Sequence, residues 1–122
     1  MRLATITAVA ACAIFLAGNA FAREAYDGAW SVDIVGKSGN CDGLSYHYDV
    51  RIVNNALRYS GADASISGHV GSNGDVSVHV SNGDNSAAGA GRLSGRYGYG
   101  KFRGRSSSGD CSGTWSATRN GG

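Results

Sequence analysis

Apolar and polar residues alternate with a period of two along most of the chain after residue 25. The clearest case is the segment 76–80, in which three valines alternate with Ser77 and His79. Successive side chains of a β-strand point to opposite faces, so this alternation predicts strands with one buried face. The pattern recurs in eight segments: residues 30–34, 46–52, 57–59, 66–70, 76–80, 87–93, the region of Phe102, and 113–117.

Short polar segments separate these predicted strands and carry the residues that turns require. They read VNNA, SGAD, GSNGD, SNGD and SSSGD. Asn-Gly favours the primed turns that join antiparallel strands, so strands that are neighbours in sequence should be neighbours in the sheet. Of the connecting segments, residues 36–45 are long enough to form a real loop. We therefore predict an all-β fold, an eight-stranded antiparallel up-and-down barrel, with a two-sheet β-sandwich as the alternative.

The predicted inner face mixes very large and very small residues. The large ones are Trp30, Tyr48, Ile52, Tyr59 and Trp115, and the small ones are Gly68, Gly89, Gly91 and Gly113. Glycine is unfavourable inside a strand unless another group packs close to it or the strand bends sharply. This mixture favours an interior filled by the two tryptophans. It leaves open a cavity for one small ligand, which an eight-stranded barrel can hold.

The N-terminus has the features of a secretory signal peptide. Arg2 is followed by an apolar run over residues 3–17, and Ala20 and Ala22 occupy the small-residue positions of a cleavage site. We predict a signal peptide over residues 1–22 and a single barrel domain over residues 23–122, exported to the periplasm or secreted. Cys12 also fits a lipoprotein cleavage box, but the apolar run continues beyond it. The run is too short to span a bilayer, which needs about 20 apolar residues.

Two cysteines, Cys41 and Cys111, follow the predicted signal peptide. In an oxidising compartment two such cysteines most simply form one disulfide, here joining the first strand region to the last. Closing a loop of about 70 residues stabilises a domain by about 4 kcal/mol in the chain-entropy model. Neither cysteine has the CxxC spacing of a redox or metal pair, so we assign both to a structural bridge.

Charge is balanced overall but unevenly distributed. The chain has 11 Lys and Arg against 9 Asp and Glu, and the basic residues gather after residue 84. Strand alternation places six side chains on an outward stripe that could bind an anionic surface such as lipid head groups or polysaccharide: Arg92, Tyr97, Tyr99, Lys101, Arg103 and Arg105. A solvated strand face is the plainer interpretation. Export argues against a nucleic-acid partner.

Candidate catalytic and metal-binding groups are few. His47, His69 and His79 all fall on the outward phase of their strands, and only the last two should lie diagonally on one face. The repeated SNGD is explained by two tight turns rather than by a calcium-binding β-roll. Ser112 lies in GDCSG without a recognisable base. We therefore predict no catalytic residues, no metal site and no cofactor.

Two segments carry a resemblance to known proteins. YDGAWSVDI at residues 26–34 and CSGTWSATR at residues 111–119 resemble a group of small exported bacterial proteins of unknown function, some loosely labelled haem utilisation or adhesion. The similarity covers essentially all of the chain after residue 22 and implies no catalytic residues.

The G-x-W of Gly28 and Trp30, with Arg119 in the last strand, is similar to the lipocalin-like barrels. That resemblance implies that Trp30 and Arg119 close one end of the barrel, and we group Trp115 with them. Small periplasmic metalloprotease inhibitors have a similar layout, but their bridge joins cysteines that are close in sequence.

These observations predict a non-catalytic, exported binding or interaction module of the bacterial cell envelope. One alternative is a periplasmic protease inhibitor that acts through an exposed loop or through residues 23–28. Another is a carrier of a small apolar ligand. The partner would be an envelope protein, a polysaccharide or a small apolar ligand.

Overall fold

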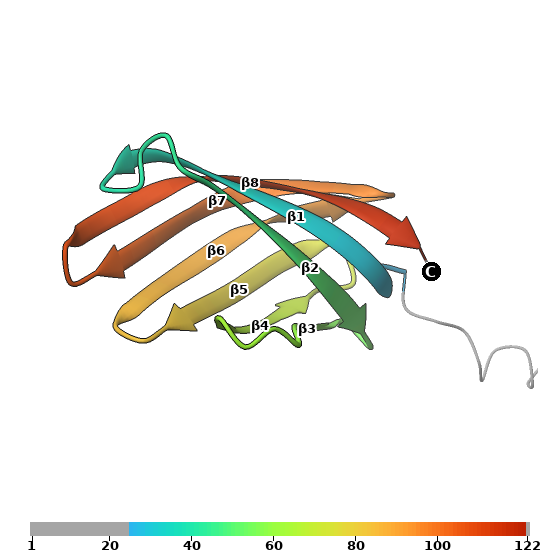
Figure 1. Cartoon of the computed structure of the whole chain (residues 1–122). Coiled ribbons are helices and arrows are strands. Elements are labelled where there is room, and N and C mark those ends of the chain that lie inside the picture. Colours follow the sequence, from blue (N-terminus) through green and yellow to red (C-terminus); the bar gives the residue numbers. More distant parts are fainter. Residues whose placement is uncertain (1–24, 122) are drawn as a thin grey trace, which may run out of the picture.

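A computed structural model describes residues 25–121, and these residues form a closed antiparallel β-barrel in which β8 returns to pair with β1 (Figure 1). The strands are β1 (Gly28–Gly39), β2 (Ser45–Val53), β3 (Ala56–Arg58), β4 (Ser65–Val70), β5 (Asp75–Asn82), β6 (Asn85–Ser94), β7 (Tyr97–Ser106) and β8 (Gly109–Gly121). The barrel prediction is confirmed, and the sandwich alternative is wrong. The predicted signal peptide lies outside the described residues. No helix in the described part is long and apolar enough to cross a membrane.

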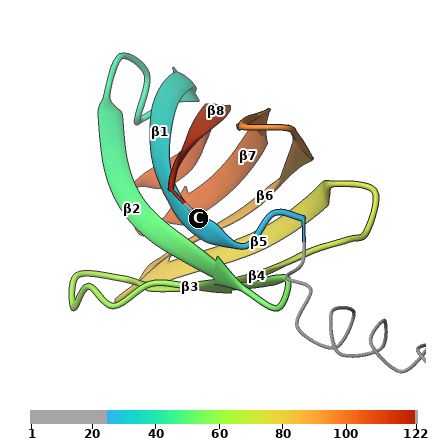
Figure 2. The same cartoon turned by 90° about the vertical axis from the view of Figure 1, so that its right-hand side faces the viewer.

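The up-and-down order divides the connections between the two ends of the barrel. The β1–β2, β5–β6 and β7–β8 loops lie at one end, at the left of Figure 1. The β2–β3, β4–β5 and β6–β7 turns lie at the other end, together with the start of β1 and the end of β8 (Figures 1 and 2). We call the first the open end and the second, where the buried core lies, the plugged end.

The prediction of a long loop over residues 36–45 is wrong. β1 continues to Gly39, where it pairs with Cys111 of β8, and only residues 40–44 connect β1 to β2. A β-bulge between Gly36 and Ser38 interrupts the register. A Cβ on Gly36 would lie 1.9 Å from the Cys41 carbonyl oxygen, so glycine is required for this close approach. Glycines and a bulge hide the alternation that marks a strand in the sequence.

A tight turn at Asn54 and Asn55 joins β2 to β3. Both residues have positive φ, 52° and 67°, which the primed hairpin turns require and asparagine tolerates. The carboxylate of Asp27, only 6% exposed, accepts hydrogen bonds from the amides of Asn54 at 2.9 Å and Asn55 at 3.2 Å. The residue that precedes β1 thereby holds the β2–β3 turn, a role that the sequence did not indicate.

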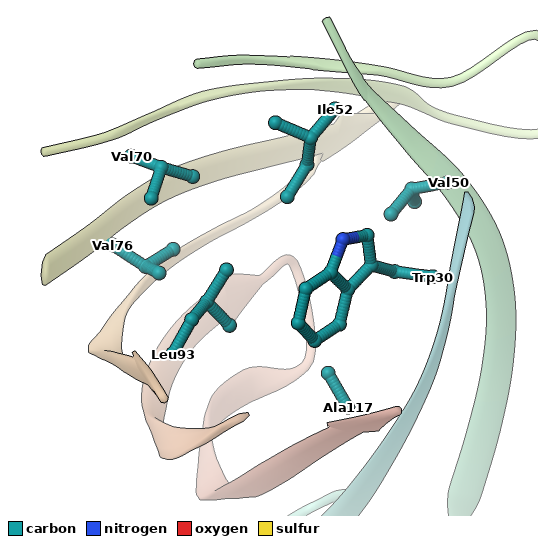
Figure 3. Packing of buried hydrophobic residues seen from close by; sticks show 7 residues of the cluster. All are labelled: Trp30, Val50, Ile52, Val70, Val76, Leu93 and Ala117. Carbon is teal, nitrogen blue, oxygen red and sulfur yellow. The ribbon is translucent and has the colours of Figure 1, made fainter. Parts of the chain in front are cut away.

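The buried core lies at the plugged end, around Trp30, which is 1% exposed (Figure 3). Side chains from five other strands surround the indole: Val50, Ile52, Val70, Val76, Leu93 and Ala117. The indole N–H of Trp30 donates to the carbonyl of Tyr26 at 2.9 Å. The Arg119 guanidinium donates to the carbonyls of Ala25 and Asp27. Trp30 and Arg119 therefore both bind the backbone that leads into β1.

The predicted disulfide is confirmed at the open end. Cys41 and Cys111 are bonded, with their Cα atoms 5.4 Å apart. The bridge ties the short connection between β1 and β2 to the start of β8, across 70 positions of sequence.

Candidate functional site

A cavity of about 360 Å³ occupies the barrel interior between the core and the open end. Its floor is the outer surface of the core, formed by Val50, Ile52, Val70, Val76 and Leu93. Its sides are mostly aliphatic and come from opposite walls, among them Val32, Ile34, Ile66, Val78 and Val80. The interior is thus filled at the plugged end and hollow at the open end. The prediction of a filled interior is wrong for the open half.

The hollow exists because β6 and β7 carry small inward residues. Ala87, Gly89 and Gly104 line the cavity wall, where larger side chains would have filled it. Of the two tryptophans, only Trp115 shows the expected packing of its ring against strand glycines. A Cβ on Gly100 would lie 2.5 Å from Trp115 Nε1, and one on Gly91 would lie 2.6 Å from Trp115 Cζ2. The Trp115 ring therefore lies flat against the wall instead of crossing the cavity.

Two tyrosines form an uncharged section of the wall. Tyr48 lines the cavity, and Tyr59 packs edge-on against it with ring centroids 5.4 Å apart. The Tyr59 hydroxyl donates to Asp63 at 2.6 Å, and this bond raises the pKa of Tyr59 to about 12. Burial raises the pKa of Tyr48 as well. Both phenols stay protonated at neutral pH, so they add no charge to the site.

The mouth combines exposed apolar side chains with amides and hydroxyls. Leu44 is 48% exposed and Tyr46 is 45% exposed, so both present apolar surface to a molecule entering from solvent. Asn40, Asn82, Asn85 and Ser106 add neutral polar groups. Among the described residues that line the cavity, the only charged side chain is Arg105. The site is therefore an apolar chamber with a polar rim and, within the described lining, no acidic group.

The residues predicted to close the barrel occupy different places. Trp30 and Arg119 lie together at the plugged end, paired across β1 and β8. Trp115 lies two positions before the buried Ala117 and faces the cavity. It packs against the edge of the core and contributes to the wall of the candidate site.

The predicted basic stripe does face outward. Tyr97 and Tyr99 are 66% and 68% exposed, and Arg92 lies opposite Tyr99 in the ladder. Arg92 Nη2 contacts Asp75 at 2.9 Å, and Arg105 Nε approaches Asp110 at 3.8 Å. Within residues 25–121, Lys101 and Arg103 form no ion pair. The middle of the stripe is therefore available for an anionic partner.

The three outward histidines lie on β2, β4 and β5. His79 lies opposite Ser67 and His69 opposite Ser77, so the two rings are diagonal neighbours, as expected. His47 lies between Asp33 and Asp49 on the outer face of β1 and β2, at 2.9 and 3.0 Å. Hydrogen bonds to Asp33 and then to Asp49 raise the pKa of His47. No group of three or more potential ligands that could hold a metal occurs in the described part of the chain.

Ser112 has a structural neighbour instead of a base. Its hydroxyl lies 2.5 Å from that of Ser38 on β1, beside the disulfide. This pair lies at the bulged end of β1.

Comparison with protein-family models, curated proteins and solved structures found no match to this chain. The resemblances carried by residues 26–34 and 111–119 therefore stay predictions. The geometry of the cavity and of the outer face is the basis on which a function can be argued.

Proposed function

We propose that this protein is a non-catalytic binding protein that carries a small apolar ligand in the open half of its barrel. The observation that supports this most directly is the cavity of about 360 Å³, which is lined by aliphatic and aromatic side chains and reached through a polar mouth. Ligand pockets in proteins have volumes of about 300–1,000 Å³, and a dry engineered cavity of about 150 Å³ already binds benzene. The volume suits a ligand of two fused rings or a short alkyl chain.

The architecture also supports binding to a pre-formed site. The core beneath the cavity floor is close-packed, and the disulfide anchors the residue 40–44 connection to β8 at the mouth. A rigid site loses little conformational entropy when it binds, so more of the gain from apolar contact remains as affinity. Each buried CH2 group contributes about 0.8 kcal/mol, or about fourfold in affinity.

The proposal keeps the wider role of an exported module of the cell envelope. The N-terminal sequence supports export, and a disulfide is typical of an oxidising compartment. Protease inhibition through residues 23–28 has less support. Residues 25–28 are bound to the barrel by the contacts of Tyr26, Asp27 and Arg119.

Calorimetric titration with hexanol, octanol and decanol would test the proposal. We expect affinity to increase by up to about fourfold per CH2 group until the chain reaches the floor. Ala87→Phe, which places a ring inside the cavity, should abolish binding. Ala90→Phe, three positions further along β6 and facing outward, is the matched control and should leave it unchanged. Absence of binding for every alcohol, or equal binding by the Ala87→Phe variant, would refute the carrier function.

A further inference from the structure

A second hollow lies on the outer side of the wall that β5, β6 and β7 contribute to the cavity. The two hollows share lining residues near the open end: Val80, Ser81, Ser86, Ala87, Ala88, Gly104 and Arg105. The second hollow is a groove near the open end that crosses β4, β5, β6 and β7 (strands labelled in Figure 1). Its lining includes Ser67, His79, Ser86, Ala88 and Arg103. These residues belong to the outward phase of their strands, and two of them, Ser86 and Ala88, also border the cavity near the open end.

The strand register explains why this part of the outer face is hollowed. Ser67, His79, Ala88 and Arg103 lie side by side in one row across four strands. In the next row, Ser86 of β6 lies between Ser81 of β5 and Arg105 of β7. β6 thus contributes small side chains, with His79 on one side and Arg103 and Arg105 on the other. Adjacent strands are about 4.8 Å apart, so the strands that carry the two walls are about 10 Å apart.

The charge of the groove is predominantly positive. Arg103 and Arg105 form one wall, and Lys101 extends the same line along β7. His79 forms part of the opposite wall. Asp110 is the one acid among the described lining residues, and it lies 3.8 Å from Arg105. Arg103 and Lys101 keep their charges free of any ion pair within residues 25–121.

We propose that this groove binds a single extended chain of an acidic polysaccharide. The cationic wall would contact carboxylate or sulfate groups, and the hydroxyls of Ser65, Ser67, Ser81 and Ser86 would hydrogen-bond to sugar hydroxyls. A narrow groove admits one polymer chain, whereas a flat bilayer would contact only its edges. Single-stranded nucleic acid relies on bases stacking on aromatic rings. Tyr97 and Tyr99 lie beyond the groove, toward the plugged end.

Binding to dextran sulfate and polygalacturonate, with neutral dextran as the reference, tests this site on the intact protein. Lys101→Ser combined with Arg103→Ser should weaken binding by about tenfold or more and reduce its salt dependence. Arg51→Ser combined with Arg58→Ser removes the same charge from the exposed outer face of β2 and β3. This control should change affinity by less than about twofold, since exposed charges beyond a Debye length are screened. An equal loss in the two double variants would overturn the proposal.

A second variant separates the shape of the groove from its charge. Ala88→Leu fills the groove without altering charge, and it should weaken polymer binding while thermal stability is retained. Unchanged polymer binding by Ala88→Leu would overturn the groove as the site. Tighter binding to vesicles containing anionic lipid, or to an oligothymidylate, than to either acidic polymer would overturn the polysaccharide assignment. Lys101, Arg103, Arg51 and Arg58 do not line the cavity, so alcohol binding should persist in both double variants.

Discussion

The two ends of this barrel are built from the same strands and packed in opposite ways. At the plugged end, Trp30 is surrounded by branched side chains and is 1% exposed. At the open end, the inward positions of the same strands enclose a cavity of about 360 Å³. One large ring is enough to fill a cross-section of the plugged end. At the open end Trp115 lies against the wall, and the centre stays empty.

The difference shows that residue volume on one wall decides whether a small barrel is filled. β6 and β7 contribute mainly alanine and glycine to the open half. Because protein interiors are close-packed, a closed void of this size would be costly, whereas this cavity opens to solvent at the mouth. Substitutions at matched positions of the two ends test this contrast, and the largest effect is expected in the core.

Trp30→Ala should be the most damaging single change. Removing a fully buried tryptophan typically costs up to about 5 kcal/mol, through lost burial and the void that remains. Phe102→Ala at the open end should cost clearly less, because the half-buried Phe102 lines a space that is already hollow. Urea unfolding of both variants measures the difference in unfolding free energy. Equal losses would mean that the two ends contribute alike to stability.

Replacing both cysteines, Cys41→Ser and Cys111→Ser, should lower the unfolding free energy by about 4 kcal/mol. The loss arises mainly in the unfolded chain, where a constraint across 70 positions is removed. The same variant should bind alcohols more weakly because the mouth is no longer anchored. Denaturant unfolding and calorimetry measure the two effects. If affinity stayed the same while stability fell, the disulfide would not be shaping the mouth.

Asp27→Asn should destabilise the plugged end by about 2 kcal/mol. The amides of Asn54 and Asn55 donate to different oxygens of the Asp27 carboxylate, and the substitution replaces one of these acceptors with an NH2 donor. Asp33→Asn on the exposed outer face is the control and should have little effect. Chemical denaturation measures the unfolding free energy of both variants. Comparable losses would show that the burial of Asp27 does not determine its contribution to stability.

Glycine-to-alanine changes under Trp115 should have opposite outcomes. A Cβ on Gly100 would lie 2.2 Å from the Ala90 carbonyl oxygen, so Gly100→Ala should cost about 1 to 3 kcal/mol. At Gly89 the nearest atom would be 3.5 Å away, an ordinary contact. Gly89→Ala should therefore be neutral or stabilising by up to about 1 kcal/mol, because alanine restricts the unfolded chain. Thermal melts of the pair test how tightly the ring sits on the wall.

The smallest effect concerns pH and the outer face. The folded pKa of His47 is raised above 6.5 because Asp33 and Asp49 favour the imidazolium. Protonated His47 therefore stabilises the folded state. This stabilisation is fully present when the pH is below the pKa of His47 in the unfolded chain, and it is lost as the pH rises through the raised pKa of the folded state. Wild type should therefore gain a little thermal stability over His47→Gln near pH 5 that is absent near pH 9. If the stability advantage of wild type over His47→Gln appeared near pH 9 instead of pH 5, neutral His47 would be the better partner for Asp33 and Asp49.

Much of the fold could be predicted because alternation is a local signal. Val76, Val78 and Val80 report their strand without reference to any distant residue, and the turns set which strands pair. Other features depend on close approaches that leave no pattern in sequence. Nothing in the sequence distinguishes Asp27 from the other eight acids, because its contact with the β2–β3 turn depends on the fold. Gly36 has the sequence surroundings of a loop residue, but it lies in β1 and pairs with Gly113 of β8.

The strand pattern, the turns, the disulfide and the outward direction of the basic stripe follow from residue type and alternation. The filled and the hollow end of the barrel follow only from the packing of side chains in three dimensions. The volume of a cavity depends on how inward side chains from all eight strands add up at each level. The groove over Ala88 is decided in the same way, since the register across β4 to β7 places small residues between large ones.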